Sequence, residues 1–113
     1  MAGRVFGQSV DEFDAWMRTI DEKNQSVQRA IAEKDAATAA SDARTLQDTF
    51  KLVEGFWSKR GDAPYAVELA RNAQEFAAGA VKSATQKDFE AASSQTIKIA
   101  GTCTACHRLY RPL

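Results

Sequence analysis

The chain has 113 residues, enough for one domain with a small core, and its 15 basic and 15 acidic residues give a formal net charge of zero. No basic stretch dominates, which argues against nucleic-acid binding, and no window approaches the run of about 20 apolar residues that crosses a bilayer. Two prolines, six glycines and frequent alanine predict an all-α protein.

The first predicted helix starts after Ser9, because Ser9 and Glu12 have the spacing of a capping box. It ends near residues 33 and 34, and a polar interruption at Lys23 and Asn24 divides its apolar stripe. That stripe consists of Phe13, Trp16, Met17, Ile20, Val27 and Ile31. The residues before this helix, MAGRVFGQSV, lack the continuous apolar region of an intact signal peptide.

The second predicted helix begins with Asp35 as its N-cap and stops at Gly61. Its inward stripe is Ala39, Ala43, Leu46, Phe50, Val53 and Trp57. Asp62 is the predicted cap of a third helix that has Pro64 in its first turn, where a missing amide costs little. The apolar face of this third helix is rich in alanine and contains Ala66, Leu69, Ala70, Ala73, Phe76, Ala77, Ala80 and Val81.

Residues 83–87 form a predicted turn, and a fourth helix begins at Thr85 or Asp88 and stops at Pro112. Its inward positions are Phe89, Ala92, Thr96, Ile99, Cys103, Cys106 and Tyr110. Four helices joined by short connections predict an antiparallel up-down-up-down four-helix bundle, a single domain over residues 1–113.

The fourth predicted helix carries the sequence C-x-x-C-H at Cys103, Cys106 and His107. This spacing is the attachment motif of a c-type haem, in which the two sulfurs hold the porphyrin and the histidine binds the iron. On a helix, residues three and four positions apart share a face, so the three side chains point the same way. His107 is the single histidine of the chain, which leaves no second group for acid–base catalysis and predicts that the protein is not an enzyme.

Two other interpretations of the cysteine pair stay open at this point. A redox-active C-x-x-C is expected beside an alternation of strands and helices, which this sequence lacks. A structural zinc site needs four ligands, so a carboxylate would have to join Cys103, Cys106 and His107.

The nine residues CTACHRLYR, from Cys103 to Arg111, extend the motif to C-x-x-C-H-x-x-Tyr-Arg. In this feature and in its helical pattern the chain resembles the class II c-type cytochromes, the cytochrome c′ family. The resemblance implies one covalently attached haem c at one end of the bundle, a periplasmic location, and either electron transfer or binding of small gases. It also implies that an export signal is not part of this sequence, that Met1 is not native, and that redox proteins are partners. The family often forms homodimers through its first two helices.

Large side chains are predicted to gather at the end of the bundle that holds His107. Antiparallel order brings together there Phe6, Phe13, Trp16, Phe56, Trp57, Tyr65 and Tyr110. A haem is a large apolar plate that needs wide, aromatic walls, although aromatic residues also fill the cores of bundles without cofactors. At the opposite end alanines let the helices approach closely, so the haem end is expected to be splayed.

Met17 is the only methionine besides Met1, and its distance from the haem end matches that of His107. Both lie about 10 Å from that end at about 1.5 Å of rise per residue. Met17 is therefore the predicted second ligand of the iron, an arrangement that suits a low-spin electron carrier. In the alternative, Met17 only packs on the haem face and a five-coordinate iron binds NO or CO.

Four further residues complete the predicted haem site. Phe13 and Trp16 flank Met17 and shape the distal face, while Arg18 pairs with a haem propionate. The resemblance places Arg111 near the proximal imidazole or a propionate, and the alternative is a solvated arginine that offsets the helix dipole. A basic rim for an acidic redox partner is predicted from Lys59, Arg60, Arg108 and Arg111.

Overall fold

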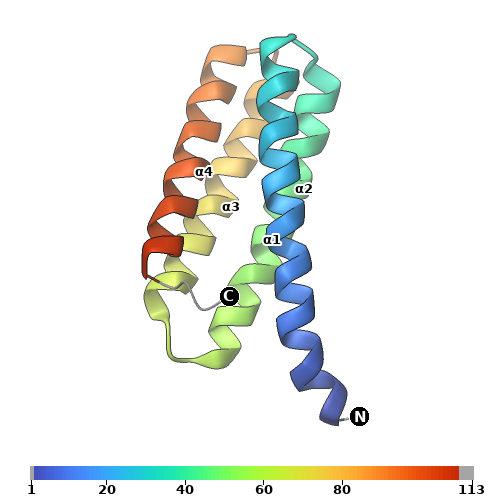
Figure 1. Ribbon diagram of the computed structural model, residues 1–113. Coiled ribbons are helices and arrows are strands. Elements are labelled where there is room, and N and C mark those ends of the chain that lie inside the picture. Colours follow the sequence, from blue (N-terminus) through green and yellow to red (C-terminus); the bar gives the residue numbers. More distant parts are fainter. Residues whose placement is uncertain (1, 110–113) are drawn as a thin grey trace.

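Four helices account for almost all of residues 2–109. The computed structural model describes the backbone of residues 2–109 and the side chains of residues 11–109. The helices are α1 (Ala2–Ala32), α2 (Ala36–Arg60), α3 (Pro64–Thr85) and α4 (Phe89–Leu109). They form the predicted antiparallel bundle, in which each helix lies beside the next and α4 returns beside α1 (Figure 1). None of the helices, over the residues described, is long and apolar enough to span a bilayer.

Side-chain and glycine caps define three of the helix ends as predicted. Asp35 accepts a hydrogen bond from the Thr38 amide at 3.1 Å, which starts α2. The side chain of Thr38 and then its amide hold the pKa of this carboxyl below its usual value. Gly61 ends α2 in the left-handed conformation, at φ 75°. Asp88 accepts a hydrogen bond from the Ala91 amide at 3.1 Å, so it and not Thr85 begins α4.

Two predicted boundaries were wrong. α1 begins at Ala2, so Ser9 lies inside the helix and does not cap it. Once a helix exists, each added residue gains a hydrogen bond at little cost, which favours continuation past a mere capping sequence. The N-cap of α3 is Ala63, without a side-chain hydrogen bond, because Asp62 is instead paired with Arg60 at 2.9 Å.

Alanine dominates the buried face of α3, as predicted. Its buried alanines are Ala66, Ala70, Ala73, Ala77, Ala80 and Ala84. Such small side chains let α3 pack closely against α2, and these two helices share the largest interface of the bundle. Leu46 of α2, Ile99 of α4 and Val27 of α1 are the largest fully buried side chains, and they fill the middle of the core.

Four aromatic rings cluster at one end of the bundle, which partly confirms the prediction. They belong to Phe13 and Trp16 of α1 and to Phe56 and Trp57 of α2. The centroid of Phe13 lies 4.4 Å from that of Phe56 and 5.6 Å from that of Trp57. Tyr65 is 45% exposed and so does not belong to the cluster's interior. The side chains of Phe6 and Tyr110 lie outside the described residues.

Asp42 of α2 is buried against α1, although aspartates usually lie at the surface. Its carboxylate accepts a hydrogen bond from the Ser26 hydroxyl at 2.5 Å and lies 3.5 Å from the Lys23 ammonium. A buried carboxylate is tolerated when such partners replace its water. Lys23, which interrupts the apolar stripe of α1, therefore serves to pair with the buried Asp42 carboxylate.

Candidate functional site

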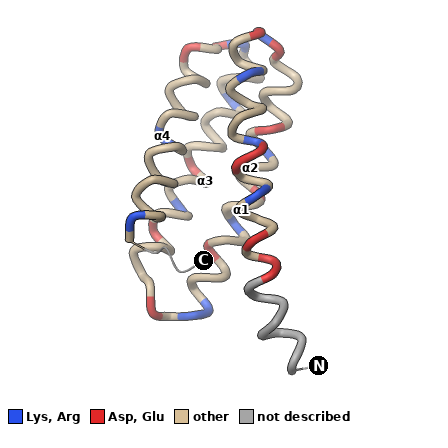
Figure 2. The backbone as a smooth tube through the Cα atoms, viewed as in Figure 1, with Lys and Arg blue, Asp and Glu red and all other residues tan. Residues whose placement is uncertain are grey.

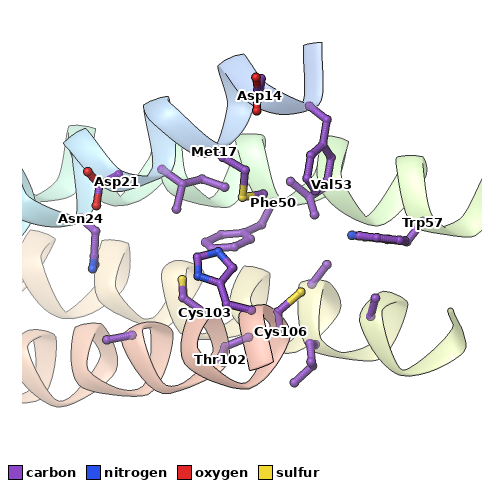
Figure 3. A pocket seen from close by; sticks show the side chains of 17 residues that line it. Asp14, Met17, Asp21, Asn24, Phe50, Val53, Trp57, Thr102, Cys103 and Cys106 are labelled. Carbon is purple, nitrogen blue, oxygen red and sulfur yellow. The ribbon is translucent and has the colours of Figure 1, made fainter. Parts of the chain in front are cut away.

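A pocket of about 460 Å³ opens at the aromatic end of the bundle. All four helices contribute to its wall, and Figure 3 shows α1 on one side of it and α4 on the opposite side. Pockets that hold cofactors and other small molecules measure about 300–1,000 Å³, so this one has the size of a binding site.

The α4 wall of the pocket contains Cys103, Cys106 and His107. Their spacing on the helix predicts a shared face, and all three line the same pocket. Both cysteines are free thiols and half-buried, whereas His107 is exposed to solvent at the pocket's edge. A flat ligand in the pocket can therefore meet two sulfurs and one imidazole from a single helix.

The α1 wall faces these groups with a stripe of Asp14, Met17, Asp21 and Asn24. These residues follow one another at intervals of three and four, so they lie on one face of α1. The Met17 thioether points from α1 into the pocket (Figure 3). The structure thus brings Met17 and His107 to one cavity from opposite helices, as their heights in the bundle predict.

Apolar side chains from α2 and α3 line the rest of the pocket. They include Phe50, Val53 and Trp57 of α2 and Leu69 of α3, and Phe13 and Ile20 of α1 complete this surface. Sequence reasoning assigns these residues to the core without separating those that border a cavity from those that fill the interior. Helical periodicity marks an inward face, but it carries no information on how far apart two facing helices stand.

Two of the predicted site residues that the structure describes do not line the pocket. Trp16 is half-buried and packs edge-on against Phe13 and Phe56, and it does not line the pocket. Arg18 is exposed and is also absent from the wall. Arg111 lies outside the described residues.

Acidic side chains line the pocket, and the basic rim around it stays a prediction because Arg111 lies outside the described residues. Among the described residues the pocket wall contains two carboxylates, of Asp14 and Asp21, and no lysine or arginine. Figure 2 shows further acidic residues on this stretch of α1. Arg60 is paired with Asp62 at 2.9 Å, and its guanidinium lies 5.2 Å from the centre of the Trp57 ring.

Burial keeps the two thiols protonated. It raises the pKa of the Cys103 thiol to about 11, with smaller contributions from Cys106 and from the Asp21 carboxylate, and it also raises the pKa of Cys106. A redox-active C-x-x-C has the opposite property, a thiol pKa lowered toward neutrality. Nor do the described residues contain a group of three or more His, Cys, Asp or Glu side chains that is arranged to hold a metal ion directly.

Two uncharged polar side chains of the pocket differ in their hydrogen bonding. The Thr102 hydroxyl donates to the Lys98 carbonyl within α4 at 3.0 Å. The Oδ1 atom of Asn24 is buried and has no hydrogen-bond partner. The sequence marks Asn24 only as a break in the apolar stripe of α1, and its position seven residues after Met17 is the signal that places both on one face.

Comparison with models of protein families, with curated proteins and with solved structures found no match to this chain. The resemblance to class II cytochromes therefore rests on the residues of the C-x-x-C-H segment and on the helical pattern.

Proposed function

We propose that this four-helix bundle holds one covalently attached haem c in the pocket between α1 and α4 and transfers electrons. The observation that carries the proposal is that both cysteines and the histidine of the C-x-x-C-H segment line one cavity, opposite the thioether of Met17. A chance C-x-x-C-H sequence on a helix surface has no need of such a cavity.

The residues present fit a haem in kind and in arrangement. The pocket has the volume of a cofactor site, and its wall combines aromatic and aliphatic side chains with few polar groups. The protonated state of the thiols opposes the alternative of a redox dithiol, and the bundle contains no strand over the residues described, where such a motif is expected. A structural zinc site needs four ligands, and the described residues contain no group of three or more His, Cys, Asp or Glu side chains that could hold a metal ion.

Each residue of the site has a distinct part in this proposal. Cys103 and Cys106 would hold the porphyrin through their sulfurs, and His107 would supply an imidazole to the iron. Phe13 and Phe50 exclude water from the pocket, which keeps its surroundings nearly unchanged during electron transfer. The bound group supplies an iron that gains or loses one electron. The periplasm, where c-type haem is attached in bacteria, is the proposed location.

Met17 is the proposed second ligand. It is the only methionine among the described side chains, it projects from α1 into the pocket, and a thioether opposite an imidazole favours a low-spin iron with a raised redox potential. If Met17 only packs, the same apolar wall encloses a five-coordinate iron that suits uncharged gases such as NO and CO.

Co-expression with a haem-attachment system tests the proposal. The expected product has the mass of the chain plus one haem, retained after acid–acetone extraction. A Cys103→Ala/Cys106→Ala double variant is expected to release its haem, and a variant of Cys103 alone to keep one thioether. A product with the mass of the bare chain would overturn the proposal.

The spectrum of a Met17→Leu variant tests the second ligand. Leucine keeps the apolar volume but removes the sulfur, so the oxidised protein is expected to change from low spin to high spin and to lose the methionine–iron charge-transfer band. Ile20→Val, a change in the same pocket wall without a ligating atom, serves as the control and should leave the spectrum unaltered. A parent protein that is already high-spin supports the gas-binding alternative.

A further inference from the structure

Asn24 brings to the pocket a buried polar atom that has no hydrogen-bond partner among the described residues. Its side chain extends from α1 into the space between the helices (Figure 3), and its buried Oδ1 accepts no hydrogen bond. Leaving a buried amide oxygen without a partner costs about 1–3 kcal/mol. A leucine or alanine at this position would avoid that cost, so the amide needs a partner that the described residues do not provide.

We expect the molecule that occupies the pocket to supply the hydrogen-bond partner of the Asn24 amide. An asparagine amide offers one acceptor and two donors of nearly the same shape, and rotation by 180° about χ2 exchanges them. After this rotation Nδ2 takes the place of the buried Oδ1, and the Asn24 side chain can donate a hydrogen bond to an anionic oxygen. The Thr102 hydroxyl, in contrast, already donates a hydrogen bond to the Lys98 carbonyl.

The proposed occupant has few groups that need a hydrogen bond. With its vinyl groups bound to the cysteines, the edge of a haem carries only methyl groups and two propionates. No lysine or arginine lines the pocket among the described residues, and the carboxylates of Asp14 and Asp21 do. A propionate that enters this wall therefore needs a neutral donor.

We infer that Asn24 binds a haem propionate, its Nδ2 donating a hydrogen bond to the carboxylate, and so fixes how the porphyrin is turned in the pocket. The inference rests on the proposed function. It makes Asn24 a positioning residue, and it replaces the predicted pairing of a propionate with Arg18, which lies outside the pocket wall.

The full-length chain with Cys103→Ala and Cys106→Ala, which retains His107, allows haem binding to be measured as an equilibrium by titration with hemin. Three changes are compared in this background. Asn24→Leu removes the amide at similar volume, Asn24→Asp keeps the shape but replaces the donor by a negative oxygen, and Thr102→Val is the matched control. Urea unfolding without hemin is measured for each variant to separate folding from binding.

Asn24→Leu is expected to bind hemin about tenfold more weakly, the effect of about 1.4 kcal/mol, and Asn24→Asp more weakly still. Thr102→Val should change the affinity by less than about twofold. Without hemin, Asn24→Leu should unfold at the same or a higher urea concentration than its parent, because an unsatisfied oxygen is lost.

Two results would overturn the inference. Equal affinity of all variants means that Asn24 does not contact the haem, and tighter binding by Asn24→Asp means that the residue accepts a hydrogen bond and does not donate one. Either can occur while the unaltered chain still acquires covalent haem, so the proposed function survives. A chain that acquires no haem removes both proposals together.

Discussion

At the residue scale, burial affects the ionisable groups of this protein in two ways. The sulfurs of Cys103 and Cys106 sit in an apolar wall, which favours the neutral thiol over the thiolate. Asp42 is also buried, but Ser26 and Lys23 supply the hydrogen bond and charge that it loses from water. The same cost of burying charge thus favours neutral thiols at one site and a polar contact between two helices at another.

Alkylation of the haem-free chain tests the state of the thiols. Its rate at Cys103 is expected to rise with pH and to show no plateau below about pH 10, because burial raises that thiol's pKa to about 11. The urea-unfolded chain is the control and should reach its plateau near the ordinary pKa of 9.0. A plateau below pH 8 in the folded chain would identify a reactive dithiol instead.

The same shift has a consequence for stability. The folded state holds the Cys103 proton more tightly than the unfolded state does, so the stabilisation is fully present below pH 9.0 and declines between pH 9.0 and about 11. Urea midpoints measured across this range should fall for the parent chain and fall less for Cys103→Ala.

At the element scale, the ends of the helices are set by local groups. Asp35, Gly61 and Asp88 were predicted as boundaries. The carboxylates of Asp35 and Asp88 accept hydrogen bonds from backbone amides, and Gly61 adopts a left-handed conformation that the lack of a side chain permits. Ser9 lies inside α1, which begins at Ala2, and the N-cap of α3 is Ala63 and not Asp62. A residue of capping type thus caps a helix only where the helix begins for other reasons, such as a turn between two packed helices.

Replacement by alanine is expected to change the stability in opposite directions at two glycines, Gly55 within α2 and Gly61 at its C-cap. Gly61→Ala is expected to destabilise the protein by about 1 kcal/mol, because an alanine at φ 75° is strained although nothing lies within 4 Å of the added carbon. Gly55→Ala, on an exposed helical position with equally open surroundings, should stabilise it by about 0.5–1 kcal/mol. Urea unfolding measures both, and equal signs would contradict the assignment of Gly61 as a left-handed cap.

At the scale of the whole molecule, the packing of the bundle is uneven. α2 and α3 share the largest interface, through alanine, while α1 and α4 share the smallest of the neighbouring pairs. A second hollow of about 430 Å³ lies along the α1–α4 seam beyond the first, and Ala100 borders both. In the haem-free chain, the contact between α1 and α4 is therefore expected to be the least stable part of the fold.

Hydrogen exchange of the haem-free chain tests this difference. Amides of α1 and α4 that border the pocket are expected to exchange at least about tenfold faster than those in the middle of α2 and α3, an opening free energy lower by about 1.4 kcal/mol. Haem attachment should remove most of the difference, because the ligand joins the two walls. Uniform protection in the haem-free chain would contradict a weak seam.

The sequence by itself determined the helical bundle, most helix ends and the common face of Cys103, Cys106 and His107. These features depend on spacing along one helix, and a helix has a fixed geometry. Only the tertiary structure decided that Asn24 borders the same cavity as Met17 and the C-x-x-C-H segment, that Trp16 and Arg18 do not, and that Asp42 is buried. The distance between two facing helices follows from how all their side chains pack together, and no single stretch of sequence contains it.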